Sequence, residues 1–346
     1  MSRGKRSRAA RVVLPAVLLA AGTGAVAAAE RVGAEEAWRG LFRRQHEAPA
    51  PADNPSTAAK VALGAQLFSD PRLSGTGRRS CASCHQPERS FSDGRARARG
   101  LGGRLLRRNT PALWNLAWSG QYFWDGRAPS LEAQVLMPIA AADEMAGDWP
   151  SILRQLGSDP TLVVAFQAVF AERPAISEAT IAKALAAYLR SLISPPTRFD
   201  AWIAGDKSAL RPHEVSGFRI FTGKAGCVLC HVGWRFTDDR FHDIGLPGTD
   251  AGRGAVTGGT PGLPAFKTPS LRQLSQTAPY MHDGSKPTLA AVVKHYAGGV
   301  LQRPSVAPNI KRELSLTAGE RADLVAFLRT LSSSDRPAGL EQAGRR

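Results

Sequence analysis

The chain has 346 residues, with 45 Lys or Arg against 29 Asp or Glu, and its formal net charge is +16. This length exceeds the usual size of a single hydrophobic core and indicates two domains. The four cysteines all fall in two short motifs, which excludes a scaffold held together by disulfides.

The first 29 residues have the pattern of a secretory signal peptide. Five cations precede an apolar run that ends in three alanines: Arg3, Lys5, Arg6, Arg8 and Arg11, then Ala27, Ala28 and Ala29. An uncleaved membrane anchor is the alternative, but Pro15, Gly22 and Gly24 interrupt the run. We therefore expect residues 1–29 to be removed and the mature protein to be periplasmic, without a membrane association.

Export also bears on the basic charge. A cluster of arginines lies between residues 95 and 108, and such a cluster could bind nucleic acid. In an exported protein it better suits a docking surface for an acidic protein, so we expect no nucleic-acid partner.

The sequence repeats one unit twice. A Gly-x-x-x-Phe segment precedes a Cys-x-x-Cys-His motif in each half, at residues 64–68 and 217–221. Each half then closes with a similar amphipathic segment, at residues 187–192 and 326–331, and Ser177 and Thr317 are the candidate N-caps of these closing helices. We predict a mainly α protein of two cytochrome c-like haem domains in tandem, with long loops.

The predicted boundaries follow from this repeat. Pro195 and Pro196 stop the first closing helix, so a linker is expected at about 194–212. In chain order we expect an N-terminal extension at 30–52, a first haem domain at 53–195, a second at 212–335, and a flexible tail at 336–346.

The two Cys-x-x-Cys-His motifs predict two covalently bound haem c groups. This spacing puts two sulfurs and an imidazole on one helical turn, where the sulfurs form thioethers and the histidine binds iron. The two sets are Cys81, Cys84 and His85, and Cys227, Cys230 and His231. A zinc site would need closer motifs, and a thioredoxin-type dithiol would need a βαβ context that is missing.

Beyond the motifs, the sequence resembles the bacterial di-haem cytochrome c peroxidase and MauG family from about Asn54 to Ser332. The most specific stretches are residues 81–85, 108–111, 123–128, 144–145, 227–231, 268–272 and 277–284. The resemblance implies that hydrogen peroxide reacts at the N-terminal haem and that the C-terminal haem handles electrons.

The resemblance also implies roles for four residues. Trp124 matches a tryptophan that relays charge between the haems, although a core aromatic is the ordinary alternative. Glu144 matches the carboxylate that moves a proton during peroxide cleavage, and an ordinary surface glutamate is its alternative. Gln134 and Pro138 match residues that line the peroxide pocket in the MauG branch.

Asn109 and the backbone carbonyls of Thr277 and Pro279 match a calcium site between the haems in this family. Oxygen ligands of this kind suit Ca²⁺. Asn109 could equally serve only as a turn former.

Two departures from the ordinary peroxidases indicate the MauG branch. There is no histidine between His85 and His213, so we expect the first haem to lack a capping ligand. Tyr296 stands where the peroxidases have a methionine ligand to the second haem, and MauG has tyrosine there too. Met281 and His295 remain rival ligands.

We therefore expect a peroxide-using oxidoreductase of the MauG type, which forms a high-valent di-haem state and oxidises Trp or Tyr side chains of a partner protein. The first alternative is a conventional peroxidase that takes electrons from a small cytochrome or cupredoxin. A non-catalytic di-haem electron carrier is an alternative of another class.

Overall fold

The computed structural model describes residues 36–172, 175–258, 264–310 and 314–333. The chain divides into two compact units, residues 1–42 and 43–346, and the second unit holds every candidate site residue. The expected signal peptide and the expected tail at 336–346 lie outside the described residues. None of the helices in the described ranges is both long and apolar enough to cross a membrane.

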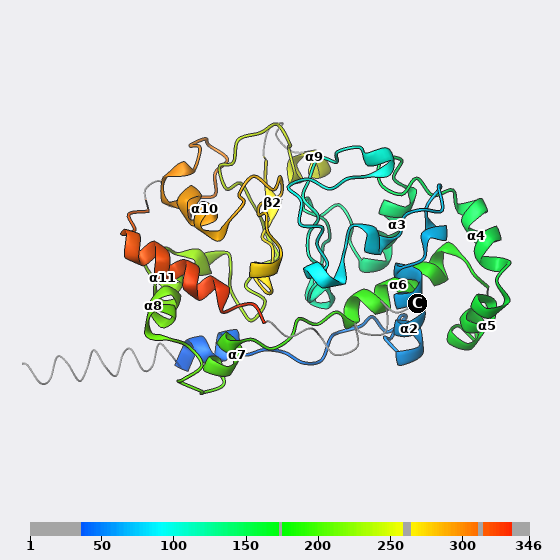
Figure 1. The fold of residues 1–346 in the computed structure, drawn as a ribbon, viewed down its shortest axis with the longest axis horizontal. Helices are drawn as coiled ribbons and strands as arrows, with labels where there is room; N and C mark the ends of the chain where they lie inside the picture. Colours follow the sequence, from blue (N-terminus) through cyan, green and yellow to red (C-terminus); the bar gives the residue numbers. More distant parts are fainter. Residues whose placement is uncertain (1–35, 173–174, 259–263, 311–313, 334–346) are drawn as a thin grey trace, which may run out of the picture. The chain divides into compact units, whose positions relative to one another are not determined.

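The predicted fold class, mainly helical with long loops, is confirmed. The α-helices of the second unit are α2 (Ala58–Phe68), α3 (Leu131–Ala140), α4 (Trp149–Gly157), α5 (Pro160–Val169), α6 (Glu178–Ser191), α7 (Arg198–Ile203), α8 (Pro212–Thr222), α9 (Arg253–Thr257), α10 (Leu289–Lys294) and α11 (Ala318–Arg329). Two short strands, β1 (Phe241–His242) and β2 (Phe266–Lys267), pair antiparallel. Short 3-10 turns and irregular segments connect them (Figure 1).

The same helix pairing occurs in both halves. Helix α2 packs against α6, and α8 packs against α11 (Figure 1). A glycine allows each pair to approach closely: a Cβ on Gly64 would lie 2.0 Å from the Ala184 carbonyl oxygen, and a Cβ on Gly217 would lie 2.0 Å from that of Asp323. The repeated glycines of the sequence therefore mark the two helix crossings.

The closing helices begin where the sequence predicts. The Ser177 side chain accepts a hydrogen bond from the Thr180 amide at the start of α6. At the start of α11, Thr317 and Glu320 form a reciprocal capping box.

The duplication extends into the loops. The turn at Tyr122, which pairs with Ala128, recurs as the turn at Tyr280, which pairs with Lys286. Each turn leads into a helix of the same half, α3 after Ser130 and α10 after Thr288, and both residues are N-caps. When the two halves are aligned on these turns, Asn109 is equivalent to Lys267, Trp124 to His282, and Pro138 to Tyr296.

The two halves have separate apolar centres. Leu67, Phe91 and Leu185 belong to the buried cluster of the first half. In the second half, the Phe199, Phe218 and Phe327 rings contact one another, with centroids 5.3 to 5.6 Å apart. Phe199 lies on α7, so this segment of the expected linker packs into the second core.

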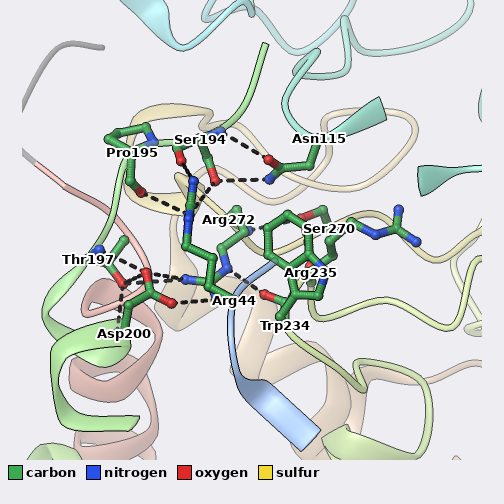
Figure 2. A network of polar contacts seen from close by, with 10 residues as sticks. All are labelled: Arg44, Asn115, Ser194, Pro195, Thr197, Asp200, Trp234, Arg235, Ser270 and Arg272. Atoms are coloured by element: carbon green, nitrogen blue, oxygen red, sulfur yellow. Dashed lines mark hydrogen bonds and ion pairs between the residues drawn. The ribbon is translucent and has the colours of Figure 1, made fainter. Parts of the chain in front are cut away.

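A polar network fixes the segment between the halves (Figure 2). The Asn115 amide donates to Ser194 Oγ at 2.9 Å, and Arg44 donates to the Ser194 carbonyl oxygen. On the other side, the buried Arg272 pairs with Asp200 at 2.8 Å and donates to the Trp234 carbonyl oxygen at 2.6 Å. Side chains of both halves therefore hold the connecting segment in place.

Candidate active site

Both motif histidines are oriented in the same way. The Nδ1 atom of His85 lies 3.0 Å from the Phe91 carbonyl oxygen, and that of His231 lies 2.8 Å from the Phe236 carbonyl oxygen. An Nδ1–H that donates to a carbonyl leaves Nε2 as the iron-binding atom. Phe91 and Phe236 both have positive φ angles, 59° and 57°, a strained backbone that recurs at functional sites.

The cysteines suit thioether attachment better than thiol chemistry. All four are free and half-buried. Burial raises the pKa of Cys81 to about 12, and burial also raises the pKa of Cys84. Since the thiolate is the reactive form, a redox-active or nucleophilic dithiol is disfavoured at the first motif.

One cavity of about 820 Å³ connects the two motifs and is lined by all six of their Cys and His residues. Its wall also includes Leu113, Leu185 and Leu328, which supply an apolar environment. A large apolar space with an imidazole and two thiols at each end matches what two covalently bound haems require. The residues present therefore fit the two haem groups.

The expected peroxide-pocket residues lie together in the first half. Gln134 and Pro138 are on α3, Glu144 follows that helix, and all three line the cavity. Burial raises the pKa of the Glu144 carboxyl, the nearby Arg127 opposes this rise, and Asp143 adds to it. A carboxyl group whose pKa is raised holds a proton more readily than an ordinary carboxyl group, as an acid and base in proton transfer must.

At the second half, the three rival ligands have different surroundings. Tyr296 lines the cavity, and burial raises the pKa of its phenol. His295 instead places its Nε2 2.9 Å from the Ile244 carbonyl oxygen. Met281 also lines the cavity, but it stands in the Tyr280 turn, whereas Tyr296 occupies the place equivalent to Pro138. Both Met281 and Tyr296 thus line the cavity, and of the three rivals only Tyr296 is equivalent to Pro138 in the repeat.

Trp124 lines the same cavity as both motifs. Its Nε1–H donates to the Asn109 carbonyl oxygen at 3.0 Å, and its own carbonyl oxygen accepts from the Lys267 amide at 2.8 Å. Trp124 is thus held by both halves and only half-buried, unlike a residue of either apolar centre.

The three expected calcium ligands also line this cavity. The Asn109 amide nitrogen donates to the Arg95 carbonyl oxygen at 2.8 Å, so a cation would be met by Oδ1. Thr277 and Pro279 precede the Tyr280 turn. The main-chain N–H of Asn109 donates to the carbonyl oxygen of His282, a residue of that turn, at 2.7 Å. The contact with His282 places Asn109 next to the Tyr280 turn that Thr277 and Pro279 precede.

Two further histidines have partners of their own. The His282 ring stacks on Phe266, with centroids 3.5 Å apart. His242 pairs with Asp238 at 2.7 Å, and within the described residues these two and Cys230 form a group of possible metal ligands. Because Cys230 belongs to a haem motif, this group does not indicate a separate metal site.

Sequence reasoning missed a charged cluster that lines the cavity, formed by Arg235, Asp239 and Lys267. Asp239 pairs with both cations. The available signal was the repeat itself, since Lys-Thr-Pro at 267–269 mirrors Asn-Thr-Pro at 109–111.

Comparisons with known proteins agree with this geometry. The family model for di-haem cytochrome c peroxidase matches residues 58–208. The methylamine utilization protein MauG of Methylorubrum extorquens is 48% identical over 300 residues, covering 86% of this chain and 85% of that protein. The cytochrome-c peroxidase IdrP1 of Denitromonas iodatirespirans is 40% identical, covering 83% of this chain and 85% of that protein.

Among solved structures, a MauG-like protein associated with microbial copper homeostasis has a TM-score of 0.76 and 34% identity, covering 84% of this chain and 94% of that one. The di-haem peroxidase BthA of Burkholderia thailandensis has a TM-score of 0.72 at 24% identity, with 86% and 92% covered, which shows the shared fold. With its two haem motifs facing one cavity, the chain belongs to the di-haem cytochrome c peroxidase and MauG family and is a peroxide-dependent oxidoreductase that uses two c-type haems.

Proposed function

We propose that this protein is a periplasmic enzyme of the MauG type, which uses hydrogen peroxide to oxidise Trp or Tyr side chains of a partner protein. The relative with 48% identity is a MauG. The N-terminal signal pattern supports export.

The observation that carries this proposal is the position of Tyr296. It lies in the cavity wall at the place that Pro138 occupies in the first half. The chain has methionines only at positions 1, 137, 145 and 281. No methionine after residue 281 is therefore present to bind the second haem in place of Tyr296. A phenolate ligand stabilises an oxidised metal, whereas methionine raises the reduction potential.

The surroundings of Tyr296 indicate what its ionisation requires. Burial raises the pKa of the phenol, so the phenolate is unfavourable in the protein alone. A positive charge close to the oxygen offsets this cost. A buried tyrosine that faces a haem cavity is therefore suited to bind ferric iron.

The remaining residues divide the chemistry between them. When bound, the haems would supply the iron that peroxide oxidises. The Glu144 carboxylate would accept a proton from peroxide and return it to the departing oxygen. Pro138 has no hydrogen-bond donor or ligand atom in its side chain, so it would not cap the iron of a first haem. Gln134 adds an amide on the same helix. Trp124 provides an indole between the halves.

We also assign the calcium site to Asn109 Oδ1 and the carbonyl oxygens of Thr277 and Pro279. Oxygen donors from one side chain and two carbonyls suit this ion, with water completing its coordination. The ion would fix the loop before the Tyr280 turn against the first half.

Spectroscopy of the fully oxidised protein tests the proposal. Peroxide added without a reductant should produce a long-lived oxidised spectrum in the wild type. Tyr296→Met should remove that spectrum and raise the reduction potential of one haem, while both haems stay attached. Tyr280→Phe serves as a control, because Tyr280 donates to the Leu274 carbonyl oxygen in the same region. If the wild type needs prior one-electron reduction before it reacts, the MauG-type proposal is wrong.

A conventional peroxidase is the second candidate. Relatives named cytochrome c peroxidase reach 40% identity, and the one from Escherichia coli is 34% identical over 84% of this chain. In that case, peroxide turnover would depend on a small redox protein as electron donor. Family membership gives no support to a non-catalytic carrier.

A further inference from the structure

Lys267 on β2 holds both ends of the segment that carries Trp124. Its main-chain amide donates to the Trp124 carbonyl oxygen at 2.8 Å. Its Nζ donates to the Gln121 carbonyl oxygen at 2.7 Å. One residue of the second half therefore clamps residues 121–124 of the first.

This contact has a counterpart across the internal repeat. Asn109 is equivalent to Lys267, and its main-chain amide donates to the His282 carbonyl oxygen at 2.7 Å, as Lys267 does to Trp124. By the same register, Gln121 is equivalent to Pro279. The Lys267 ammonium therefore contacts the carbonyl that corresponds to a proposed calcium ligand.

The charges around Lys267 explain how a cation is kept there. The side chain is only 13% exposed, and Nζ lies 2.9 Å from Asp239 Oδ1. Burial lowers the pKa of Lys267 and Asp239 opposes this. The segments after the two haem motifs align at Phe91 and Phe236, which makes Gly94 equivalent to Asp239, so the Asn109 site has neither the amine nor this carboxylate. A buried ion pair of this kind is costly to break by removing one partner.

We propose that Lys267 is a positioning residue whose ammonium is a built-in cation, the counterpart of the proposed calcium ion across the repeat, and that it fixes the Gln121–Trp124 segment of the first half against the second. The inference rests on the proposed function for the calcium ligands and for Trp124. It implies that calcium secures one turn of the duplicated pair and that Lys267 secures the other without metal.

Amide hydrogen exchange of the holoprotein separates the two clamps. Lys267→Met removes the ammonium but keeps the length and the main-chain amide. Exchange at residues 121–128 should then rise on the order of tenfold to a hundredfold, as expected for the loss of a charge-assisted hydrogen bond. Residues 279–286 should stay as in the wild type. Removing calcium with EGTA should have the converse effect, raising exchange at 279–286 and sparing 121–128.

Lys183→Met is the matched control. Lys183 also donates to a carbonyl oxygen, that of Asp53 at 2.8 Å, and pairs with the same residue's carboxylate at 3.4 Å. It lies on α6, so its loss should change neither 121–128 nor 279–286. If Lys267→Met leaves 121–128 unchanged, or raises exchange uniformly across the second half, the inference is wrong.

Calcium stoichiometry supplies a second measurement. Lys267→Asn would place an amide oxygen beside the Asp239 carboxylate and the Gln121 carbonyl, an oxygen-only set that suits Ca²⁺. This variant should bind one more calcium ion than the wild type, and calcium should restore slow exchange at 121–128. An unchanged stoichiometry overturns the inference. If the wild type binds no calcium while Lys267→Asn binds one, the proposed Asn109 site and the comparison of Lys267 with calcium both fail, and only the positioning role of Lys267 stands.

Discussion

Glu144 allows a sharp test of proton transfer, because neighbouring charges act on its pKa in opposite directions. Burial raises the pKa of Glu144, Arg127 lowers it and Asp143 raises it. A residue that accepts a proton must first be ionised. The rate constant for reaction with peroxide should therefore rise with pH through this raised pKa and then reach a plateau.

Glu144→Gln keeps the shape of the side chain and removes the ionisable group. On the plateau we expect a loss on the order of a hundredfold to ten-thousandfold, the usual contribution of general acid and base catalysis. The rise of the rate with pH should also disappear. Stopped-flow mixing of the oxidised protein with peroxide measures both effects, and intact mass establishes that both haems remain.

Two neighbouring variants make the sign of the effect testable. Asp143→Asn removes a charge that raises the Glu144 pKa, so the rise in rate should move to lower pH. Arg127→Gln removes a charge that lowers it, so the rise should move to higher pH. Shifts of both variants in one direction, or a retained rise in Glu144→Gln, would refute the assignment of the proton-transfer group.

Three further predictions concern the scaffold and its cofactors. Intact mass should show two covalently added haems in the wild type and one when Cys227 and Cys230 are both replaced by alanine; an unchanged mass addition would exclude attachment at the second motif. Gly64→Ala and Gly217→Ala should each lower the free energy of unfolding by about 1–3 kcal/mol, because the new Cβ would meet a carbonyl oxygen at 2.0 Å; a gain of about 1 kcal/mol in denaturant unfolding, as in an open helix, would contradict these helix crossings. EGTA should lower the melting temperature of the wild type but not of Asn109→Ala, since only a protein that binds calcium loses stability with it; equal shifts would place the ion elsewhere.

The sequence was informative wherever function needs a short local pattern. The haem motifs, the caps at Ser177 and Thr317, and the helix-contact glycines all depend on spacings of a few residues. Such spacings fix geometry within one helical turn. Local rules therefore sufficed for the fold class and for both haem-binding motifs.

The contacts between the halves could not be predicted in this way. The main-chain N–H of Asn109 donates to the His282 carbonyl oxygen, and that of Lys267 donates to the Trp124 carbonyl oxygen. Both hydrogen bonds join residues that are far apart in the sequence. Hydrogen bonds to main-chain carbonyls leave no residue-type signature at the acceptor. The role of Lys267 therefore could not be predicted without the fold, although the sequence already shows that Lys267 is equivalent to Asn109 in the repeat.

The internal repeat suggests how one duplicated scaffold can hold two unlike haem sites. Both halves orient the motif histidine through a carbonyl of a phenylalanine with positive φ, so the proximal side is alike. The differences lie at equivalent positions on the other side: Pro138 cannot bind iron, whereas Tyr296 can. The two positions follow the same turn and helix start, but Pro138 lies within α3, whereas Tyr296 lies in a π-helical turn, His295–Gly299, that follows α10. The proposed asymmetry between the two haem sites therefore combines a difference in side chain with a local change of backbone at the equivalent position.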